Sequence, residues 1–292
     1  MVKAEDSPKA EAHSSKVSPT AWGVAYLRKF SAIPFSTEIF ELLEARRIAA
    51  GIPDFAGEMK RAPLAPQLEA RYKLVDRLVN STGIDQILEV ASGSAPRGIN
   101  FAIANPATSY VETDLPSMAA EKRDILANLS IELPKNLKIE PADALSIEDL
   151  ERAVAGFSEQ KPIVIVNEGL MRYLNFTQKT IYARNVKQLL ERFGGAWITP
   201  DISLRSAMER EDEVADGHIQ KLATMTGVDL SQNVFENEDQ AQDFFEGLGF
   251  TVETHSFLEV SDELVSPGKL GMSPEQVERL NGPCPAFVMR LK

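Results

Sequence analysis

The fold of this 292-residue chain is decided by the stretch Gln86-Ile87-Leu88-Glu89-Val90-Ala91-Ser92-Gly93-Ser94-Ala95-Pro96-Arg97-Gly98. An apolar strand passes here into a run of small residues, and a helix is expected to begin after it. Small residues let the backbone approach a ligand closely, as glycines do in dinucleotide-binding folds. The stretch therefore predicts a strand, a ligand-binding loop and a helix in succession.

Further apolar runs follow this junction, separated by intervals long enough for helices. They are Ser109–Glu112, Leu137–Glu140, Ile163–Asn167 and Ala196–Ile202, with two late runs at Phe250–Phe257 and Ala286–Leu291. Strands that alternate with helix-length intervals indicate βαβ units and a parallel sheet. One connecting helix is well marked, because Asn175 can cap its start and Gly194 can end it. The pattern predicts an α/β fold with a doubly wound, mostly parallel seven-stranded sheet.

A single domain is expected over residues 19–292, preceded by a flexible tail. Residues 1–18 are poor in large apolar groups and cannot bury enough surface to offset the entropy of ordering. The expected parts of the domain are a helical cap at 19–83, a ligand-binding core at 84–203, a helical lid insertion at 204–246 and the final two strands at 247–292. The insertion is too long for a simple crossover and is expected to cover the strand ends.

The composition excludes several functional classes. The net charge is -12, which disfavours nucleic acid, because backbone phosphates require clustered Lys and Arg. A single cysteine, Cys284, and three histidines argue against a disulfide or a metal site. No apolar run reaches the roughly 18 residues of a membrane helix, and the N-terminus lacks the apolar segment of a signal peptide. We therefore expect a soluble cytoplasmic protein with a small-molecule partner; its oligomeric state is not encoded in these patterns.

Acidic residues stand at the ends of the next three expected strands. Asp114 can accept hydrogen bonds from both hydroxyls of a ribose. Asp143 can accept one from the exocyclic amine of adenine, and Glu168 follows the fourth strand. Each acid alone is commonly a helix cap or a solvated loop residue, but three in register favour a cofactor that contains a nucleoside.

Four segments carry a family resemblance. They are Ser18–Ala21 with Val24–Arg28, the Leu88–Gly98 loop, Asp114–Pro116 with Lys122, and Glu168–Leu174. These segments resemble the leucine carboxyl methyltransferase family, in the branch of small-molecule O-methyltransferases associated with polyketide pathways. The last segment is the most specific, because the family typically shows Glu-Gly-Leu, a short spacer and Tyr-Leu. The chain departs from the family pattern at Ala95, where an aspartate is common, and in the spacer Met171-Arg172-Tyr173.

The resemblance implies a class I methyltransferase that uses S-adenosylmethionine and releases S-adenosylhomocysteine. It implies that Arg71 grips the carboxylate of the cofactor, for which a guanidinium fork is suited. Gly93 would line the methionine part, and Asp114 would hold the ribose. Asp143 and the backbone of Ala144 would hold the adenine, while Glu168 would accept from the ammonium group of the cofactor. The expected cofactor-binding set is completed by Glu89, Ala91 and Leu115.

Methyl transfer depends on positioning, with the methyl group and the acceptor atom in line about 3 Å apart. No catalytic triad is needed, and the catalytic residues stay open. A carboxylate acceptor is already ionised at neutral pH, whereas a phenol or alcohol calls for a base. The candidate base is His218, in the insertion, which also fits a plain surface histidine. Trp22, Tyr26 and Tyr173 are candidate substrate contacts that equally fit packing.

The main hypothesis is an O-methyltransferase acting on a carboxylate or hydroxyl of a small molecule in secondary metabolism. Carboxyl methylation of a protein C-terminus is a second hypothesis, and it requires a groove for the tail. An NAD-dependent oxidoreductase is a third, although the first loop lacks the full glycine triplet of such enzymes. A non-catalytic binding protein with the same fold is the fourth, which analogy at the level of the fold leaves open.

Overall fold

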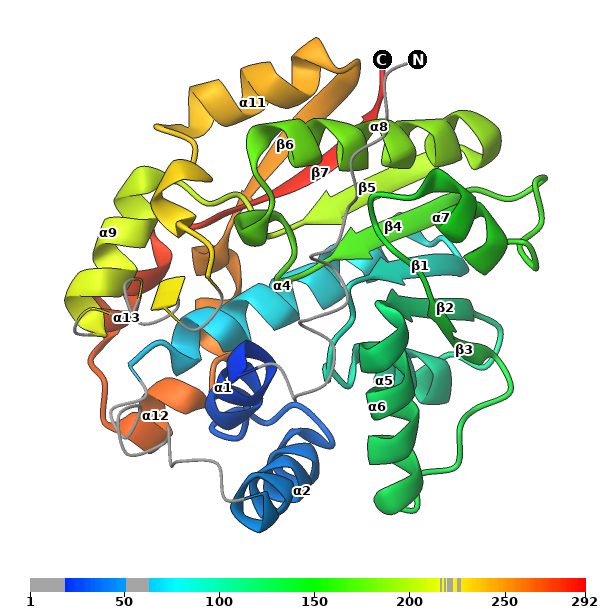
Figure 1. Ribbon diagram of the computed structural model, residues 1–292. Helices are drawn as coiled ribbons and strands as arrows, with labels where there is room; N and C mark the ends of the chain where they lie inside the picture. The colour runs from blue at the N-terminus through cyan, green and yellow to red at the C-terminus, as the bar shows by residue number, and fades with distance from the viewer. Residues whose placement is uncertain (1–18, 51–62, 216, 218, 220–222, 225–226) are drawn as a thin grey trace, which may run out of the picture.

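A computed structural model describes residues 19–50, 63–215, 217, 219, 223–224 and 227–292 (Figure 1). One sheet has the strand order β3-β2-β1-β4-β5-β7-β6. The strands are β1 Gln86–Val90, β2 Ser109–Asp114, β3 Leu137–Pro141, β4 Ile163–Asn167, β5 Gly195–Thr199, β6 Phe250–Ser256 and β7 Pro285–Leu291. β1 to β5 pair in parallel, and β7 lies antiparallel between β5 and β6. The predicted doubly wound, mostly parallel sheet is confirmed.

The strand order reverses between β1 and β4, which are direct neighbours although β2 and β3 separate them in sequence. Every residue of these two strands is buried, which explains their nearly continuous apolar runs. In open parallel sheets, ligands bind beyond the carboxyl ends of the strands at such a reversal. The topology therefore places the expected site beyond Val90 and Asn167.

Helices cover the sheet on both sides. Their bounds are α1 Pro19–Arg28, α2 Ser36–Ala49, α4 Ala65–Thr82, α5 Arg97–Ala104, α6 Pro116–Asn128, α7 Ile147–Ala153, α8 Phe176–Phe193, α9 Arg205–Val214, α11 Glu238–Gly247, α12 Ser266–Leu270 and α13 Pro274–Asn281. The short 3-10 helices are η2 Met171–Tyr173, η3 Leu230–Gln232 and η4 Phe257–Glu263. The predicted start of α8 is confirmed: Asn175 accepts from the Gln178 amide, and the Gln178 side chain accepts from the Asn175 amide.

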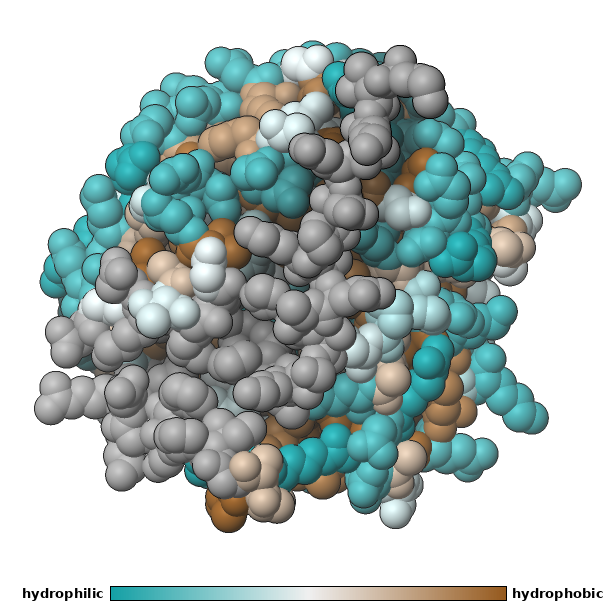
Figure 2. Space-filling model, in the orientation of Figure 1, coloured by the Kyte–Doolittle hydropathy of each residue, from teal (hydrophilic) through white to brown (hydrophobic). Residues whose placement is uncertain are grey.

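The helices at the N-terminal end of the described chain form a second apolar cluster beside the main core. Trp22 and Tyr26 of α1 pack there against Phe40 of α2 and Leu68 of α4. Figure 1 shows α1 and α2 on the same side of the molecule as the start of α4. Polar side chains cover most of the described surface in the same view, as expected for amphipathic helices around a buried sheet (Figure 2).

The end of β5 and the insertion that follows it differ most clearly from the expectation. β5 ends at Thr199 and not at Ile202, because Pro200 lacks a donor for the sheet and Asp201 turns toward the loop after β4. The insertion is less helical than predicted where it is described. Between η3 and α11 its backbone bridges to the start of α9, with the Phe235 amide donating to Ser203. In the described ranges, none of the helices has the length and apolarity needed to cross a membrane.

The contact between the starts of β5 and β4 can be tested at Gly195. Its φ is +107°, and a Cβ there would lie 1.9 Å from the carbonyl oxygen of Ile163. Because that neighbour is backbone, it cannot rotate away. We expect Gly195→Ala to lower the free energy of unfolding by about 3 kcal/mol or more, measured by urea denaturation.

The matched control is Gly247→Ala at the end of α11. A Cβ at that position meets no atom within 4 Å, so the change should be neutral or stabilise by up to about 1 kcal/mol. Equal denaturation midpoints for the two variants would contradict the close approach of β5 to β4.

Candidate functional site

The loop after β1 is fixed by the carboxylate at the end of β2. Ala91 and Gly93 both have positive φ, at 58° and 51°. The amide of Gly93 donates to Asp114 Oδ2 at 2.7 Å, and the amide of Leu115 donates to Oδ1 at 2.8 Å. Burial raises the pKa of Asp114 above its usual value, against the effect of these two amides. The structure thus brings Gly93, Asp114 and Leu115 together at the strand ends.

The loop after β3 presents an acceptor and a free donor side by side. Asp143 is exposed, and its Oδ1 accepts from the amide of Leu145 at 2.9 Å. Ala144 is buried, and its carbonyl accepts from Asn185. Within the residues that the structure describes, the N–H of Ala144 has no hydrogen-bond partner. A carboxylate oxygen beside an unpaired amide suits the amine and ring-nitrogen edge of adenine.

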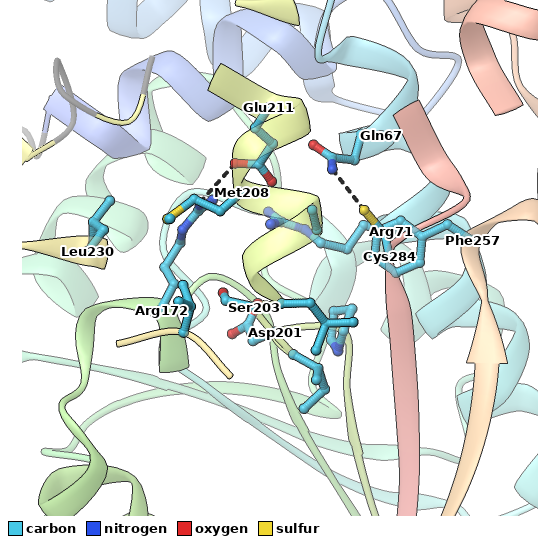
Figure 3. A pocket seen from close by; sticks show the side chains of 15 residues that line it. Gln67, Arg71, Arg172, Asp201, Ser203, Met208, Glu211, Leu230, Phe257 and Cys284 are labelled. Carbon is cyan, nitrogen blue, oxygen red and sulfur yellow. Dashed lines mark hydrogen bonds and ion pairs between the residues drawn. The ribbon is translucent and has the colours of Figure 1, made fainter. Parts of the chain in front are cut away.

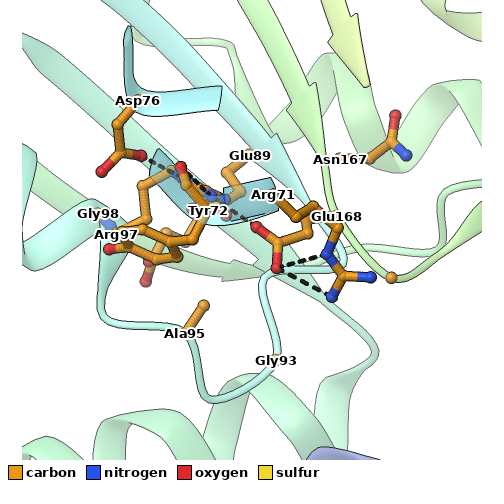
Figure 4. A network of polar contacts seen from close by, with 12 residues as sticks. Arg71, Tyr72, Asp76, Glu89, Gly93, Ala95, Arg97, Gly98, Asn167 and Glu168 are labelled. Carbon is orange, nitrogen blue, oxygen red and sulfur yellow. Dashed lines mark hydrogen bonds and ion pairs between the residues drawn. The ribbon is translucent and has the colours of Figure 1, made fainter. Parts of the chain in front are cut away.

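Three arginines converge on Glu168, directly after β4. Figure 4 shows two of them, Arg71 and Arg97. Arg28 Nη2 donates to Glu168 Oε1 at 2.8 Å, and Arg71 Nε donates to the same oxygen at 3.1 Å. Arg71 Nη2 lies 3.0 Å from that oxygen, within ion-pair distance. Arg97 Nη2 donates to Glu168 Oε2 at 2.5 Å. The Glu168 side chain is only 2% exposed. We call these four residues the arginine cluster.

Other carboxylates hold Arg97 in place. Its Nη1 donates to Glu89 at 2.8 Å, its Nε donates to Asp76 at 2.7 Å, and its side chain is fully buried. Glu89 also accepts from the hydroxyl of Tyr110. Glu89 was expected to bind the cofactor; the structure shows it neutralising Arg97 beneath the loop.

The arginine cluster determines the ionisation of Glu168. Burial alone would raise the pKa of this carboxyl, but the guanidinium groups of Arg71, Arg97 and Arg28 outweigh burial and hold the pKa well below its usual range. Glu168 is therefore an anion at any pH at which the protein is expected to work.

One donor of the arginine cluster is unpaired. The Arg28 side chain is only 6% exposed, and its buried Nε has no hydrogen-bond partner among the described residues. Arg28 and Arg71 also share a single carboxylate oxygen. A buried donor without a partner costs roughly 1–3 kcal/mol. An anionic ligand beside Arg28 and Arg71 would remove this cost, so the pair fits a second carboxylate. In the loop after β1, Ser92 Oγ is likewise buried, and none of the residues that the structure describes forms a hydrogen bond with it.

A pocket opens beyond the ends of β4 and β5, under α9 (Figure 3). About 570 Å³ is free of protein atoms, including the mouth that opens to solvent. Its apolar wall includes Ile202, Leu204, Met208, Leu230, Val234 and Phe257. Arg71 and Arg172 approach it from opposite sides. Because Arg71 also binds Glu168, the pocket adjoins the arginine cluster.

Asp201 shapes the loop that carries Glu168. Its Oδ1 accepts from the amide of Gly169 at 2.7 Å, and its Oδ2 accepts from the amide of Leu170 at 2.7 Å and from Asn167 Nδ2 at 3.0 Å. Asp201 was not among the expected site residues. The signal was available, because Asp201 is another acid at a strand end.

The residues expected to contact the substrate lie outside this pocket or outside the described part of the chain. Trp22 and Tyr26 are buried, with ring centroids 5.9 Å apart, and both pack on Phe40. Neither lines the pocket, and Tyr173 does not line it either, whereas its neighbour Arg172 does. His218 lies outside the described residues. Leu115 is half exposed beside Asp114. Across the described ranges, no His, Cys, Asp and Glu side chains gather in a group that could hold a metal ion.

Sequence reasoning missed Arg28 and Arg97 as site residues. Both stand in segments that resemble the family, but their side chains meet Glu168 only through the packing of α1 and α5. No local pattern signals that convergence.

The charge balance of the arginine cluster predicts a pH-dependent stability. A carboxylate whose pKa is lowered on folding stabilises the protein above its unfolded pKa, and this contribution is lost as pH falls through the folded pKa. We expect Glu168→Gln to be less stable than the wild type by about 3 kcal/mol at pH 7, because three buried guanidiniums lose their shared anion. The difference should shrink progressively below about pH 4.5 in urea denaturation series.

Glu159→Gln is the control, because Glu159 pairs with Arg192 at an exposed site. Its effect should stay within about 1 kcal/mol at every pH. A Glu168→Gln variant as stable as the wild type at pH 7 would show that the arginine cluster does not depend on this anion.

Several solved structures are similar to this chain. A DUF574 family protein from Streptomyces avermitilis matches with a TM-score of 0.60 at 12% identity, over 94% of this chain and 98% of that one. PigF with SAH matches with a TM-score of 0.48 at 15% identity, over 96% of this chain and 72% of that one. The mitomycin 7-O-methyltransferase MmcR has a TM-score of 0.47 at 12% identity, over 94% and 74% of the two chains. No curated protein sequence matches the chain.

The fold is that of the class I S-adenosylmethionine-dependent methyltransferases. Residues 36–186, just over half of the chain, match the model of leucine carboxyl methyltransferases. The chain therefore belongs to the leucine carboxyl methyltransferase family. It is a methyltransferase, and its cofactor is S-adenosylmethionine.

Proposed function

We propose that this protein methylates a carboxylate or hydroxyl oxygen of a small molecule, as part of secondary metabolism. The observation that supports this proposal best is that Arg71 takes part in two neighbouring sites. Its guanidinium belongs to the arginine cluster and to the wall of the mostly apolar pocket. A cofactor held through Arg71 would border the space in which an acceptor binds.

The described residues fit S-adenosylmethionine in three places. Arg28 and Arg71 would bind its carboxylate, because one buried donor of this pair is unpaired. Asp114 would accept from the ribose hydroxyls. Asp143 and the free N–H of Ala144 would bind the adenine. When bound, the cofactor supplies an electrophilic methyl group on a positively charged sulfur.

Glu168 is poorly placed to accept from the ammonium group of the cofactor, the role that the family resemblance implied. Its two oxygens already accept from three guanidiniums, whose charge would repel an ammonium group brought to the same place. We infer that Glu168 acts through the arginines, by orienting Arg28 and Arg71 toward the carboxylate of the cofactor. Ala91 and Gly93 would let the backbone of the β1 loop lie against the methionine part.

The pocket favours an acceptor oxygen that is already ionised. No histidine occurs among its described lining residues. Burial raises the pKa of the Cys284 thiol to about 12, so this group is protonated at neutral pH. Asp201 is occupied by backbone amides, and Glu211 is paired with Arg172. A carboxylate acceptor needs no base and therefore suits this lining.

Ligand-dependent stability tests the proposed cofactor. S-adenosylhomocysteine at 100 times its dissociation constant should stabilise the protein by about 2.7 kcal/mol, which corresponds to a rise in Tm of roughly 5 to 10 °C. NAD should give no shift. Asp114→Asn should reduce the shift at a fixed ligand concentration, whereas Asp85→Asn, before the amino end of β1, should not. A shift with NAD alone, or with neither ligand, would overturn the proposal.

The carboxylate site can be separated from the nucleoside site with two ligands. 5′-Methylthioadenosine has the nucleoside but lacks the amino-acid carboxylate. Arg28→Gln and Arg71→Gln should each weaken S-adenosylhomocysteine binding by roughly tenfold or more in calorimetric titration, because a hydrogen bond to a charged group is lost. Binding of 5′-methylthioadenosine should be unchanged.

Arg77→Gln is the control variant. Arg77 lies on α4, as Arg71 does, but it pairs with Glu263 at an exposed position. It should bind both ligands as the wild type does. Equal losses for both ligands in the Arg28 and Arg71 variants would show that these arginines support the pocket and do not contact the carboxylate.

A further inference from the structure

A second guanidinium in the pocket is incompletely paired. Arg172 lies in η2, directly after the Glu168 loop, and Glu211 lies on α9 of the insertion. Arg172 Nη2 donates to Glu211 Oε2 at 2.9 Å, and both side chains are largely buried. In the described part of the chain, no group accepts a hydrogen bond from the buried Arg172 Nε. The proposed cofactor contacts do not use either residue.

Glu211 uses only part of the hydrogen-bonding capacity of Arg172, so another carboxylate could bind this guanidinium more strongly. A guanidinium binds a carboxylate most strongly through two parallel N–H groups, whereas Glu211 contacts one nitrogen of Arg172. Asp201, the other acid of the pocket, cannot complete the fork, because its oxygens accept from the amides of Gly169 and Leu170. Between these two side chains the structure shows one hydrogen bond, from Arg172 Nη2 to Glu211, and a carboxylate that binds two nitrogens of Arg172 could replace it.

The surroundings define what else a ligand must carry. The wall around Arg172 is formed by apolar side chains, among them Met208, Leu230 and Val234. Figure 3 shows Arg172 and Glu211 directed toward one another beside Met208, with Arg71 across the pocket. A molecule that fills this space needs an apolar body and one anionic group.

We propose that the pocket selects organic acids, with the anionic group of the acceptor on Arg172 in place of Glu211. This inference rests on the proposed function and names the class of its acceptor. Arg172 is then a specificity-determining residue, and Glu211 is an internal competitor that occupies the fork until an acid arrives. A neutral molecule of the same shape cannot replace Glu211 on Arg172, so the Arg172–Glu211 pair stays intact. Such a molecule therefore binds without the charge-assisted contact that an acid makes.

The test uses matched acids and amides on the full chain. Benzoate, 3-phenylpropanoate and octanoate are each titrated beside their primary amides by calorimetry, with and without saturating S-adenosylhomocysteine. We expect at least one acid to bind roughly tenfold more tightly than its amide. Arg172→Gln should abolish this preference. Glu211→Gln should strengthen binding of the acid several-fold and leave the amide unchanged, because the competing charge is gone.

Glu236→Gln is the matched control. It breaks an exposed ion pair with Arg205 in the same insertion and should change none of the affinities. The inference is wrong if no acid binds better than its amide, or if the preference survives in Arg172→Gln. Should Arg172→Gln fail to fold, the Glu211→Gln result decides alone, and unchanged acid binding there overturns the inference. Failure of S-adenosylhomocysteine to bind the wild type would instead count against the proposed function.

Discussion

A buried carboxylate organises this protein. Taking an ionised group out of water costs several kcal/mol unless counter-charges and hydrogen bonds surround it. Glu168 meets this constraint with arginines from three helices: Arg28 ends α1, Arg71 lies within α4, and Arg97 begins α5. Each helix is thereby held against the carboxyl end of β4. The point at which the sheet topology reverses and the point at which the charges converge are the same place.

Carboxylates also fix the loops around Glu168, here by accepting hydrogen bonds from backbone amides. A carboxylate from one strand end accepts the backbone amides of the loop after the neighbouring strand. Asp114 does so for the loop after β1, and Asp201 does so for the loop after β4. Backbone groups held in advance need no ordering when a ligand arrives, so less binding energy is lost. The strand ends form a rigid edge against which a cofactor would fit.

The pocket lies next to these strand ends, on the side of α9. Its apolar wall lowers the local dielectric, which strengthens the interactions of Arg71 and Arg172 with any anion that enters. Such an environment also suits methyl transfer from a sulfonium to an anionic oxygen, because two opposite charges disappear in the step and a dry site favours that change. The incomplete pairing of Arg172 and the unpaired donor of Arg28 both agree with the proposal that an anion would bind at each of these two arginines.

The sequence alone predicted a doubly wound sheet of seven mostly parallel strands, the start of α8 at Asn175 and the placement of Asp114 at a strand end. These features are local: strand and helix periodicity, caps and turn residues are read from neighbouring positions. The packing of distant segments brings Arg28, Arg71 and Arg97 together at Glu168 and buries Trp22 and Tyr26 away from the pocket. It likewise ended β5 at Thr199 by turning Asp201 to the next loop. The reason is physical: a pairing between distant segments depends on how helices rotate and pack on the sheet, and no periodicity along the chain records that rotation.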